Sequence, residues 1–206
     1  MAPTRRHWGR SLLAVRLNPV ATWLFSRVCC SVIEYRQATS SDTKAIAALH
    51  ADSWRRHYRG SYSDTYLDGD VDADLFRLWS ARLRSPDPTH DTIVAYDEET
   101  LVGFVHTILD ADPTLGALID NLHVSHGRQR LGIGTELMAR AADFVIRAAP
   151  GKGLHLLVLE RNRRARAFYE SVGGVYVDRE PSEAPGGGTI IGLRYVWADP
   201  DVLLWH

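Results

Sequence analysis

The stretch that decides the fold is Gln129-Arg130-Leu131-Gly132-Ile133-Gly134-Thr135. It lies between an apolar segment, 118–124, and a helical pattern that runs from 136 to 149. A strand, a glycine-bearing turn and a helix start in this order form an anion site, because the first N–H groups of a helix are unpaired and its dipole adds positive charge. Gly132 and Gly134 have no Cβ, so a phosphate can approach the backbone closely. We therefore expect a phosphate or pyrophosphate ligand here.

The turn differs from two common phosphate-binding motifs. It is too short for a P-loop and lacks the Lys-Ser/Thr pair that would reach a γ-phosphate and its metal. It also lacks the third glycine of the dinucleotide fingerprint, since Leu137 stands at that position. With no βαβ repeat in the pattern, a dinucleotide-binding α/β protein is the weaker alternative. We expect the phosphate to bind without Mg²⁺ and predict no metal site.

Two ordered motifs carry a family resemblance. The Q-x-x-G-x-G pattern from Gln129 to Gly134 resembles the pyrophosphate loop of the GNAT superfamily, the acetyl-CoA-dependent N-acetyltransferases. The segment Asn162-Arg163-Arg164-Ala165-Arg166-Ala167-Phe168-Tyr169-Glu170, followed by Gly173, is similar to the family's N-x-x-A-x-x-F-Y-E-x-x-G segment. It follows a strand-like run, 154–159. The resemblance covers roughly residues 33–197.

The resemblance implies an α+β (mixed α/β) fold of the GNAT type. Its central sheet is mixed but mostly antiparallel, has about seven strands, splays between the fourth and fifth strands, and is flanked by helices. The hydrophobic periodicity and turn residues predict strands over 33–38, 91–96, 101–109, 116–124, 154–159, 175–179 and 189–197. They predict helices over 42–58, 73–84 and 134–148, and a short helix around Tyr169 that ends near Gly173. Asp72 is the expected cap of the helix at 73–84.

The resemblance also implies an activity and its residues. The chain is expected to move an acetyl group from acetyl-CoA to the primary amine of a small molecule or a peptide, by direct transfer. The expected cofactor-binding residues are Leu122, Val124, Gln129, Arg130, Leu131, Gly132, Gly134, Thr135 and Asn162. Asn162 could instead simply cap the following helix. For Arg128, Arg130, Arg163 and Arg164, contact with the phosphates and a solvated surface remain equal alternatives.

Catalysis needs a proton for the departing thiolate and a neutral amine. Tyr169 matches the general acid of the family, and its phenol can protonate a thiolate because their ordinary pKa values, about 10 and about 8.5, are close. The resemblance implies a carboxylate on the fourth strand or a chain of waters as the base. Asp120 and His123 are the local candidates, and a buried, hydrogen-bonded His123 is the alternative. Because side chains alternate along a strand, we expect only one of them to face the cleft. Trp54, Tyr58 and Tyr62 are the expected residues of the acceptor pocket, although Trp54 could belong to the core.

Composition excludes several other classes. The 206 residues suit one domain, and 45% hydrophobic with 24% charged residues is typical of a soluble globule. Residues 1–31 hold five arginines and no acid, whereas 19 basic and 25 acidic residues give the remainder a charge of −6. Such a body is a poor nucleic-acid binder. Only two lysines against many arginines suggest a GC-rich bacterial genome.

The domain organisation follows from the same counts. We expect a single N-acetyltransferase domain over 32–206, as a monomer or homodimer in the cytoplasm, with no membrane association. Cys29 and Cys30 are the only cysteines, and neighbouring Cα atoms about 3.8 Å apart are too close for an ordinary disulfide. Residues 1–31 read as an extension that is disordered, or as sequence upstream of a true start at Val32.

Two alternatives complete the predictions. The acidic run 68–74 invites a calcium interpretation, but Ala73 and Trp79 stand where the loop would need Gly and Glu. His123 and His126 lack companion ligands for a metal. The second functional hypothesis is a catalytically silent CoA-binding module of the same fold. Tyr169 beside Asn162 favours the enzyme, because binding alone does not require the phenol.

Overall fold

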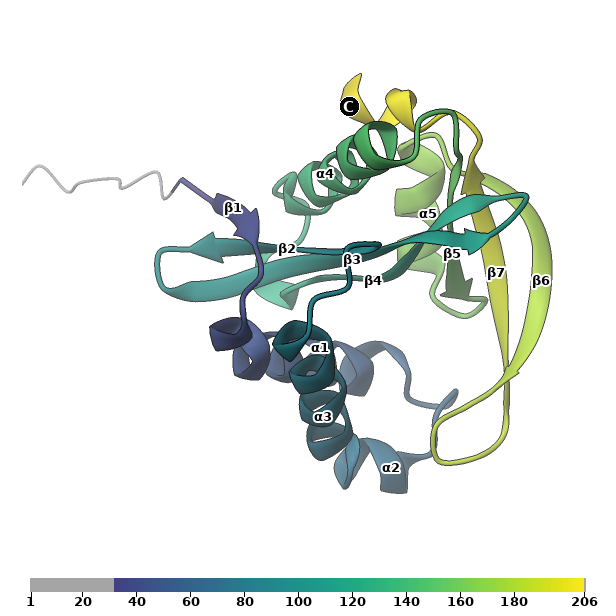
Figure 1. Cartoon of the computed structure of the whole chain (residues 1–206). Helices are drawn as coiled ribbons and strands as arrows, with labels where there is room; N and C mark the ends of the chain where they lie inside the picture. The colour runs from purple at the N-terminus through teal and green to yellow at the C-terminus, as the bar shows by residue number, and fades with distance from the viewer. Residues whose placement is uncertain (1–31, 206) are drawn as a thin grey trace, which may run out of the picture. The chain divides into compact units, whose positions relative to one another are not determined.

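In the computed structural model, which describes residues 32–205, a seven-stranded sheet has helices on both faces (Figure 1). The strand order is β1-β2-β3-β4-β5-β7-β6, and each neighbouring pair is antiparallel except the parallel pair β4 and β5. This arrangement confirms the expected mixed, mostly antiparallel α+β sheet and rules out a doubly wound dinucleotide fold. The expectations for residues 1–31 lie outside the described residues.

The strands lie close to their predicted positions. They are β1 (Glu34–Gln37), β2 (His90–Asp97), β3 (Thr100–Asp112), β4 (Gly116–Val124), β5 (Leu154–Leu159), β6 (Val175–Glu183) and β7 (Thr189–Trp197). The predicted bounds of β4, β5 and β7 are confirmed. β6 continues four residues beyond its prediction through Pro181, which is tolerated because β6 is an edge strand and needs no hydrogen-bond donor there.

Two helical layers enclose the sheet. On one face lie α1 (Thr43–His57), α2 (Asp64–Asp68) and α3 (Val71–Arg84), and on the other lie α4 (Ile133–Ala148) and α5 (Arg163–Ser171) (Figure 1). The short 3₁₀ helices are η1 (Ser40–Asp42), η2 (His126–Arg128) and η3 (Pro200–Trp205), and η3 packs on α4. Each layer has its own core: α4 and α5 pack around Leu137, Met138 and Leu156, while α1 and α3 pack around Ile46, Trp79 and Phe104.

The start of the second long helix differs from its prediction. We expected Asp72 to cap a helix that begins at 73, but α3 begins at Val71, with Asp70 in the cap position. Val71 is fully buried, so packing draws it into the first turn. Asp72 consequently lies inside that turn, where its carboxylate pairs with Arg55 of α1.

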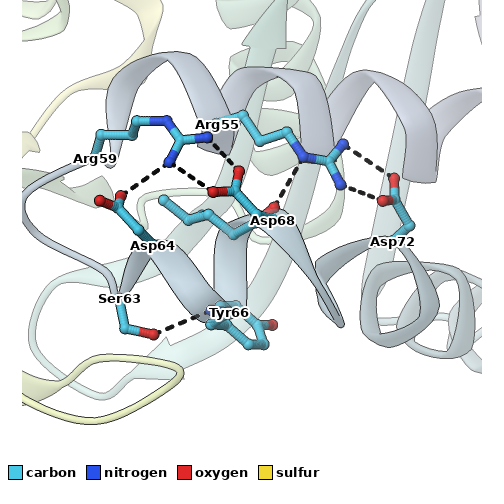
Figure 2. A network of polar contacts seen from close by, with 8 residues as sticks. Arg55, Arg59, Ser63, Asp64, Tyr66, Asp68 and Asp72 are labelled. Atoms are coloured by element: carbon cyan, nitrogen blue, oxygen red, sulfur yellow. Dashed lines mark hydrogen bonds and ion pairs between the residues drawn. The ribbon is translucent and has the colours of Figure 1, made fainter.

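Between α1 and α3, where no helix is predicted, the chain forms α2, which ion pairs hold to Arg59 just beyond α1 (Figure 2). Arg59 donates to Asp64 at 2.9 Å and also pairs with Asp68. Arg55 donates through Nε to the carbonyl of Leu67 at 2.9 Å, beside its pair with Asp72. Asp64, Asp68 and Asp72 are therefore paired with arginines. Within residues 32–205 no cluster of three or more metal-ligating side chains occurs.

The β6–β7 hairpin reaches from the edge of the sheet to α2 (Figure 1). Gly186 at its tip has φ +82°, and a Cβ there would lie 2.6 Å from Ser63 Oγ and 2.7 Å from the Cβ of Tyr66. Arg161, which follows β5, donates to the carbonyl of Gly60 at 2.8 Å. These contacts join the α1–α2 segment to the β5–β7 half of the sheet. None of the helices in the described part of the chain is long and apolar enough to cross a membrane.

Candidate active site

A cavity of about 720 Å³ opens where β4 and β5 separate. Only two residue pairs join these strands, Ala117 with Leu154 and Leu118 with His155. Beyond them β4 stays with β3 and β5 stays with β7, so the strands diverge and the predicted splay is confirmed. Residues 119–124 of β4, 156–159 of β5, the loop at 129–135, α5 and the end of α1 line the cavity.

The loop at 129–135 presents free backbone donors. Among the described residues, no acceptor receives a hydrogen bond from any backbone N–H between 129 and 135, and the first bond of α4 runs from Glu136 N to the carbonyl of Gly132 at 3.0 Å. Gly132 and Arg130 have φ values of +81° and +66°. These left-handed conformations point successive N–H groups away from the backbone, where they have no internal acceptor. A helix start with such a turn is a site for an anion.

The two glycines of this loop have different functions. A Cβ at Gly132 would meet nothing within 4 Å, so this position leaves space above the loop. A Cβ at Gly134 would lie 3.3 Å from Cζ of Phe168. Gly134 therefore lets α4 pack closely on α5, in addition to lining the cavity. At position 134 a glycine is therefore required for helix packing as well as for the expected approach of a phosphate.

The other loop residues divide between cavity and surface. Gln129, Arg130 and Thr135 line the cavity, and Gln129 Nε2 donates to the carbonyl of Val124 at 3.2 Å. Leu131 is 64% exposed and does not line the cavity, so only its backbone N–H can serve the predicted role. Arg128 pairs with the buried Asp97 at the end of β2, which anchors the loop to the β2–β3 hairpin.

A β-bulge in β4 overturns the expectation that only one candidate base faces the cleft. His106 of β3 pairs with Asn121 and Thr107 pairs with Ile119, so Asp120 is an extra, unpaired residue. The bulge shifts the alternation, so that Asp120 contacts Arg82 of α3 and His123 contacts Ser53 of α1 on the same side of the sheet, and both line the cavity. The sequence offered no signal for it, because Ile119-Asp120-Asn121 is compatible with a regular strand.

Arg82 of α3 holds the bulge. It donates to Asp120 Oδ2 at 2.7 Å and to Asn121 Oδ1 at 3.1 Å, and its guanidinium lies 5.1 Å from the Trp79 ring centroid. Asp120 is therefore an ion-paired carboxylate. No sequence pattern points to Arg82, because its contact with Asp120 joins residues 38 positions apart.

His123 is a neutral imidazole at the cavity wall. Its Nδ1 lies 2.8 Å from Ser53 Oγ of α1, and its ring centroid lies 4.4 Å from that of the buried His50. Burial lowers the pKa of His123 to about 3, because desolvation disfavours the imidazolium. His50 has its pKa lowered well below the usual value, also mainly by burial, and accepts a hydrogen bond from Trp79 Nε1 at 3.1 Å.

Tyr169 of α5 and Asn162 before it line the same cavity. The Tyr169 ring is buried against Trp197 and Phe168, and burial raises the pKa of its phenol. Burial is the only cause of this shift, and among the described residues the hydroxyl has no hydrogen-bond partner. Asn162 caps α5, since its Oδ1 accepts from Ala165 N at 3.1 Å. Asn162 therefore caps the helix, as the alternative expected, and its Nδ2 group makes no side-chain hydrogen bond with the described residues.

An aromatic wall forms the opposite side of the cavity. Trp54 stacks on Tyr58 with centroids 5.6 Å apart, and Tyr62 meets both rings edge-on at 5.0 and 4.9 Å. The three predicted acceptor residues therefore lie together at the cavity. Trp54 also packs on the core between α1 and α3, so it is both a cavity residue and a core residue.

Comparison with known proteins identifies the family. Residues 51–174, well over half of the chain, match the model of the acetyltransferase (GNAT) family. The chain belongs to the GNAT family of acetyl-CoA-dependent acetyltransferases. A bacterial relative, the uncharacterized N-acetyltransferase YuaI of Bacillus subtilis (strain 168), is 25% identical over 158 residues, which cover 75% of this chain and 87% of YuaI.

Solved GNAT structures share the fold. The PaiA N-acetyltransferase of Thermoplasma acidophilum, solved in complex with coenzyme A, has a TM-score of 0.60 at 20% identity, covering 81% of this chain and 99% of that one. YncA of Salmonella typhimurium, an acetyltransferase solved with acetyl-CoA, has a TM-score of 0.57 at 17% identity, covering 80% and 92%. At these identities the likeness concerns the fold alone.

The GNAT cavity has further lining residues that the sequence analysis did not select. Ser53 and His57 come from α1, and Glu180 and Ser182 come from β6. Glu180 pairs with Arg194 of the neighbouring strand β7. Neither a motif nor a periodic pattern distinguishes these side chains, because the hairpin and α1 meet at the cavity only in the folded chain.

Proposed function

We propose that this cavity binds acetyl-CoA across the loop at 129–135 and transfers its acetyl group directly to a primary amine held at the aromatic wall. The observation that carries the proposal is the row of unpaired N–H groups, which lies in the same cavity as the Tyr169 phenol. An anion site alone would serve many ligands. Here the anion site shares its cavity with a buried phenol and with the gap between β4 and β5. This combination suits a long thioester that carries phosphate groups.

The loop and its neighbours fit the chemistry of acetyl-CoA. The donors of Gln129 to Thr135 and the guanidinium of Arg130 suit the pyrophosphate, and Arg164 adds a second positive charge at the cavity. Towards β5, the edge of β4 beyond Leu118 has no strand partner, so backbone groups around Leu122 and Val124 can pair with the amides of the pantetheine arm. Asn162 Nδ2 provides a further donor.

The transfer itself balances without a covalent enzyme intermediate. The amine nitrogen forms a bond to the acetyl carbon and the C–S bond breaks, so the CoA sulfur leaves as a thiolate. The thiolate takes its proton from the Tyr169 phenol, and the proton that the amine nitrogen loses restores the phenol. Burial raises the pKa of this phenol, so it is protonated in neutral solution and is a weaker acid than a free tyrosine. Residues 32–206 contain no cysteine for an acetyl-enzyme, which favours a ternary complex.

The state of the amine decides how much catalysis the base must provide. Deprotonating a lysine-like amine at pH 7 costs roughly 4–5 kcal/mol, whereas an α-amino group costs about 1 kcal/mol. Asp120 is paired with Arg82, and His123 has its pKa lowered to about 3. Burial makes His123 a weak proton acceptor, and Arg82 occupies the Asp120 carboxylate, so we expect the amine to react as a species that is already neutral.

Calorimetry with acetyl-CoA in chelator-treated buffer tests the binding. We expect saturable heat at micromolar acetyl-CoA, because the loop needs no metal to hold the pyrophosphate. A folded protein that gives no heat at high micromolar acetyl-CoA would contradict the proposal. An amine panel with detection of the released CoA thiol then tests the transfer.

A further inference from the structure

We propose that the acceptor is an aromatic amine whose nitrogen is neutral at neutral pH, with its ring against Trp54, Tyr58 and Tyr62 and its amino group directed at His123. This inference rests on the proposed function and names the substrate class of the same cavity. Three features of the cavity support it: the pairing of its carboxylates, the state of His123, and the shape of the aromatic wall.

The first feature is that the cavity offers an ammonium ion no free counter-ion. Its lining includes two carboxylates, Asp120 and Glu180, and each is already paired with an arginine, Arg82 and Arg194 respectively. Two further arginines, Arg130 and Arg164, line it and add positive charge. An ammonium that enters would lose hydration without gaining a free carboxylate, so the charged form of an amine is disfavoured.

The second feature is the polar group that remains. The titratable side chains at the cavity beyond the four ion-paired or basic groups are His57, His123 and the three tyrosines, 58, 62 and 169. Burial lowers the pKa of both histidines and raises the pKa of all three tyrosines, so these groups carry no charge at neutral pH. With Nδ1 of His123 engaged by Ser53, Nε2 is the atom left for a neutral amine.

The third feature is the wall itself. The rings of Trp54, Tyr58 and Tyr62 pack on one another at centroid distances between 4.9 and 5.6 Å. They therefore form a surface rather than an open cage that could surround a cation. A flat ring can stack on this surface and bury its apolar area. The wall selects for an aromatic body, and the charge pattern selects for a neutral nitrogen.

The experiment compares two isomers, 4-methylaniline and benzylamine. Both contain one ring, one extra carbon and one primary amine, but at neutral pH the nitrogen of 4-methylaniline is neutral and that of benzylamine is charged. With saturating acetyl-CoA at pH 7, we expect kcat/KM for 4-methylaniline to exceed that for benzylamine by at least about tenfold. An alkylamine with a lysine-like pKa is neutral only to the order of 10⁻³ at this pH.

Two variants test the cause of the selectivity. R82Q frees Asp120 from its ion pair, and R194Q frees Glu180. At least one of them should shift the ratio of kcat/KM about tenfold towards benzylamine, because the cavity then holds an unpaired carboxylate. R147Q is the matched control, since Arg147 pairs with Asp143 on the exposed side of α4 and should leave the ratio unchanged.

Each outcome decides the inference. Preferential acetylation of benzylamine, micromolar inhibition by charged benzylamine, or an unchanged ratio in both arginine variants with normal acetyl-CoA affinity overturns it. Turnover of neither isomer by protein that binds acetyl-CoA also overturns the substrate class, while the proposed cofactor site stands. A protein that does not bind acetyl-CoA fails the proposed function itself.

Discussion

Tyr169 combines a packing role with a chemical one, and a single oxygen separates the two. Y169F keeps the ring against Trp197 and Phe168 and removes the hydroxyl. We expect turnover to fall by about 10²-fold, within the usual range for a general acid. Acetyl-CoA affinity, measured by calorimetry, should change little. The variant should also remain folded, because the hydroxyl has no hydrogen-bond partner among the described residues.

The readout must report the chemical step. Initial rates with a verified acceptor, under conditions where chemistry limits turnover, provide it. An undiminished rate in Y169F would leave Tyr169 as a packing residue. Parallel initial-rate lines against the two substrates would indicate an acetyl-enzyme and contradict direct transfer.

In Asn162 helix capping and cofactor binding can likewise be tested separately, because they use different atoms of the side chain. Its Oδ1 caps α5, so N162A should lower the free energy of unfolding by about 1 kcal/mol, as the loss of a helix cap usually does. N162S keeps a capping oxygen but has no amide donor. We therefore expect N162S to unfold close to the wild type in urea, while both variants bind acetyl-CoA more weakly. Wild-type affinity in N162S would assign Asn162 to capping alone.

At the scale of elements, the loop before α4 and the turn after it provide a matched pair of glycines. Gly132 and Gly151 have φ values of +81° and +79°, and neither would bring a Cβ within 4 Å of another atom. G132A and G151A should each cost about 1–2 kcal/mol of stability from the left-handed backbone. Only G132A should weaken acetyl-CoA binding, because its methyl group enters the space above the loop.

Thermal unfolding and calorimetry on the two variants check this prediction together. Equal losses of stability with unequal losses of affinity support a phosphate site at the loop. Equal affinities would show that Gly132 serves only the turn. G134A is unsuitable for this purpose, because its methyl group would also press on Phe168.

The elements also show what sequence reasoning can reach. β4, β5 and β7 were predicted with correct bounds, because each is a short apolar run with clear turn residues at its ends. α2 was missed, since five polar-rich residues around one buried leucine give no periodic signal. The bulge at Asp120 and the partners of Arg82 and Arg128 depend on contacts between distant segments, so periodicity could not reveal them.

The sequence predicts which residues lie at the candidate site better than it predicts their ionisation states. The two motifs placed the loop, Asn162 and Tyr169 on the cavity, and the aromatic residues joined them. The ionisation state of each group depends instead on its neighbours. Asp120 carries an arginine partner and His123 is desolvated, and neither condition is written in the local sequence.

At the scale of the whole molecule, buried histidines tie stability to pH. Burial lowers the pKa of His106 and His123 to about 3, and that of His50 well below the usual value near 6.5. As pH falls below about 6.5, the unfolded chain takes up protons that the folded chain does not. Stability is therefore complete above that pH and is lost on acidification, by up to about 1.4 kcal/mol per pH unit for each such group.

Urea unfolding between pH 7 and pH 5 measures this loss. H106Q removes one titrating group and retains an amide that can bond to Thr92, whose Oγ1 lies 2.8 Å from His106 Nδ1. We expect the stability of H106Q to fall less steeply with acidification than that of the wild type. Identical slopes would show that His106 takes up its proton in the folded state.

The sheet is joined across its middle by only two residue pairs between β4 and β5. A pantetheine arm paired with β4 would act as a further strand between its two halves, and the ligand would become part of the protein's own hydrogen-bond network. Amide hydrogens on both sides of the gap should then exchange with solvent more slowly in the complex than in the free protein. In such a molecule cofactor supply and resistance to degradation are coupled, because the same backbone groups serve binding and cohesion.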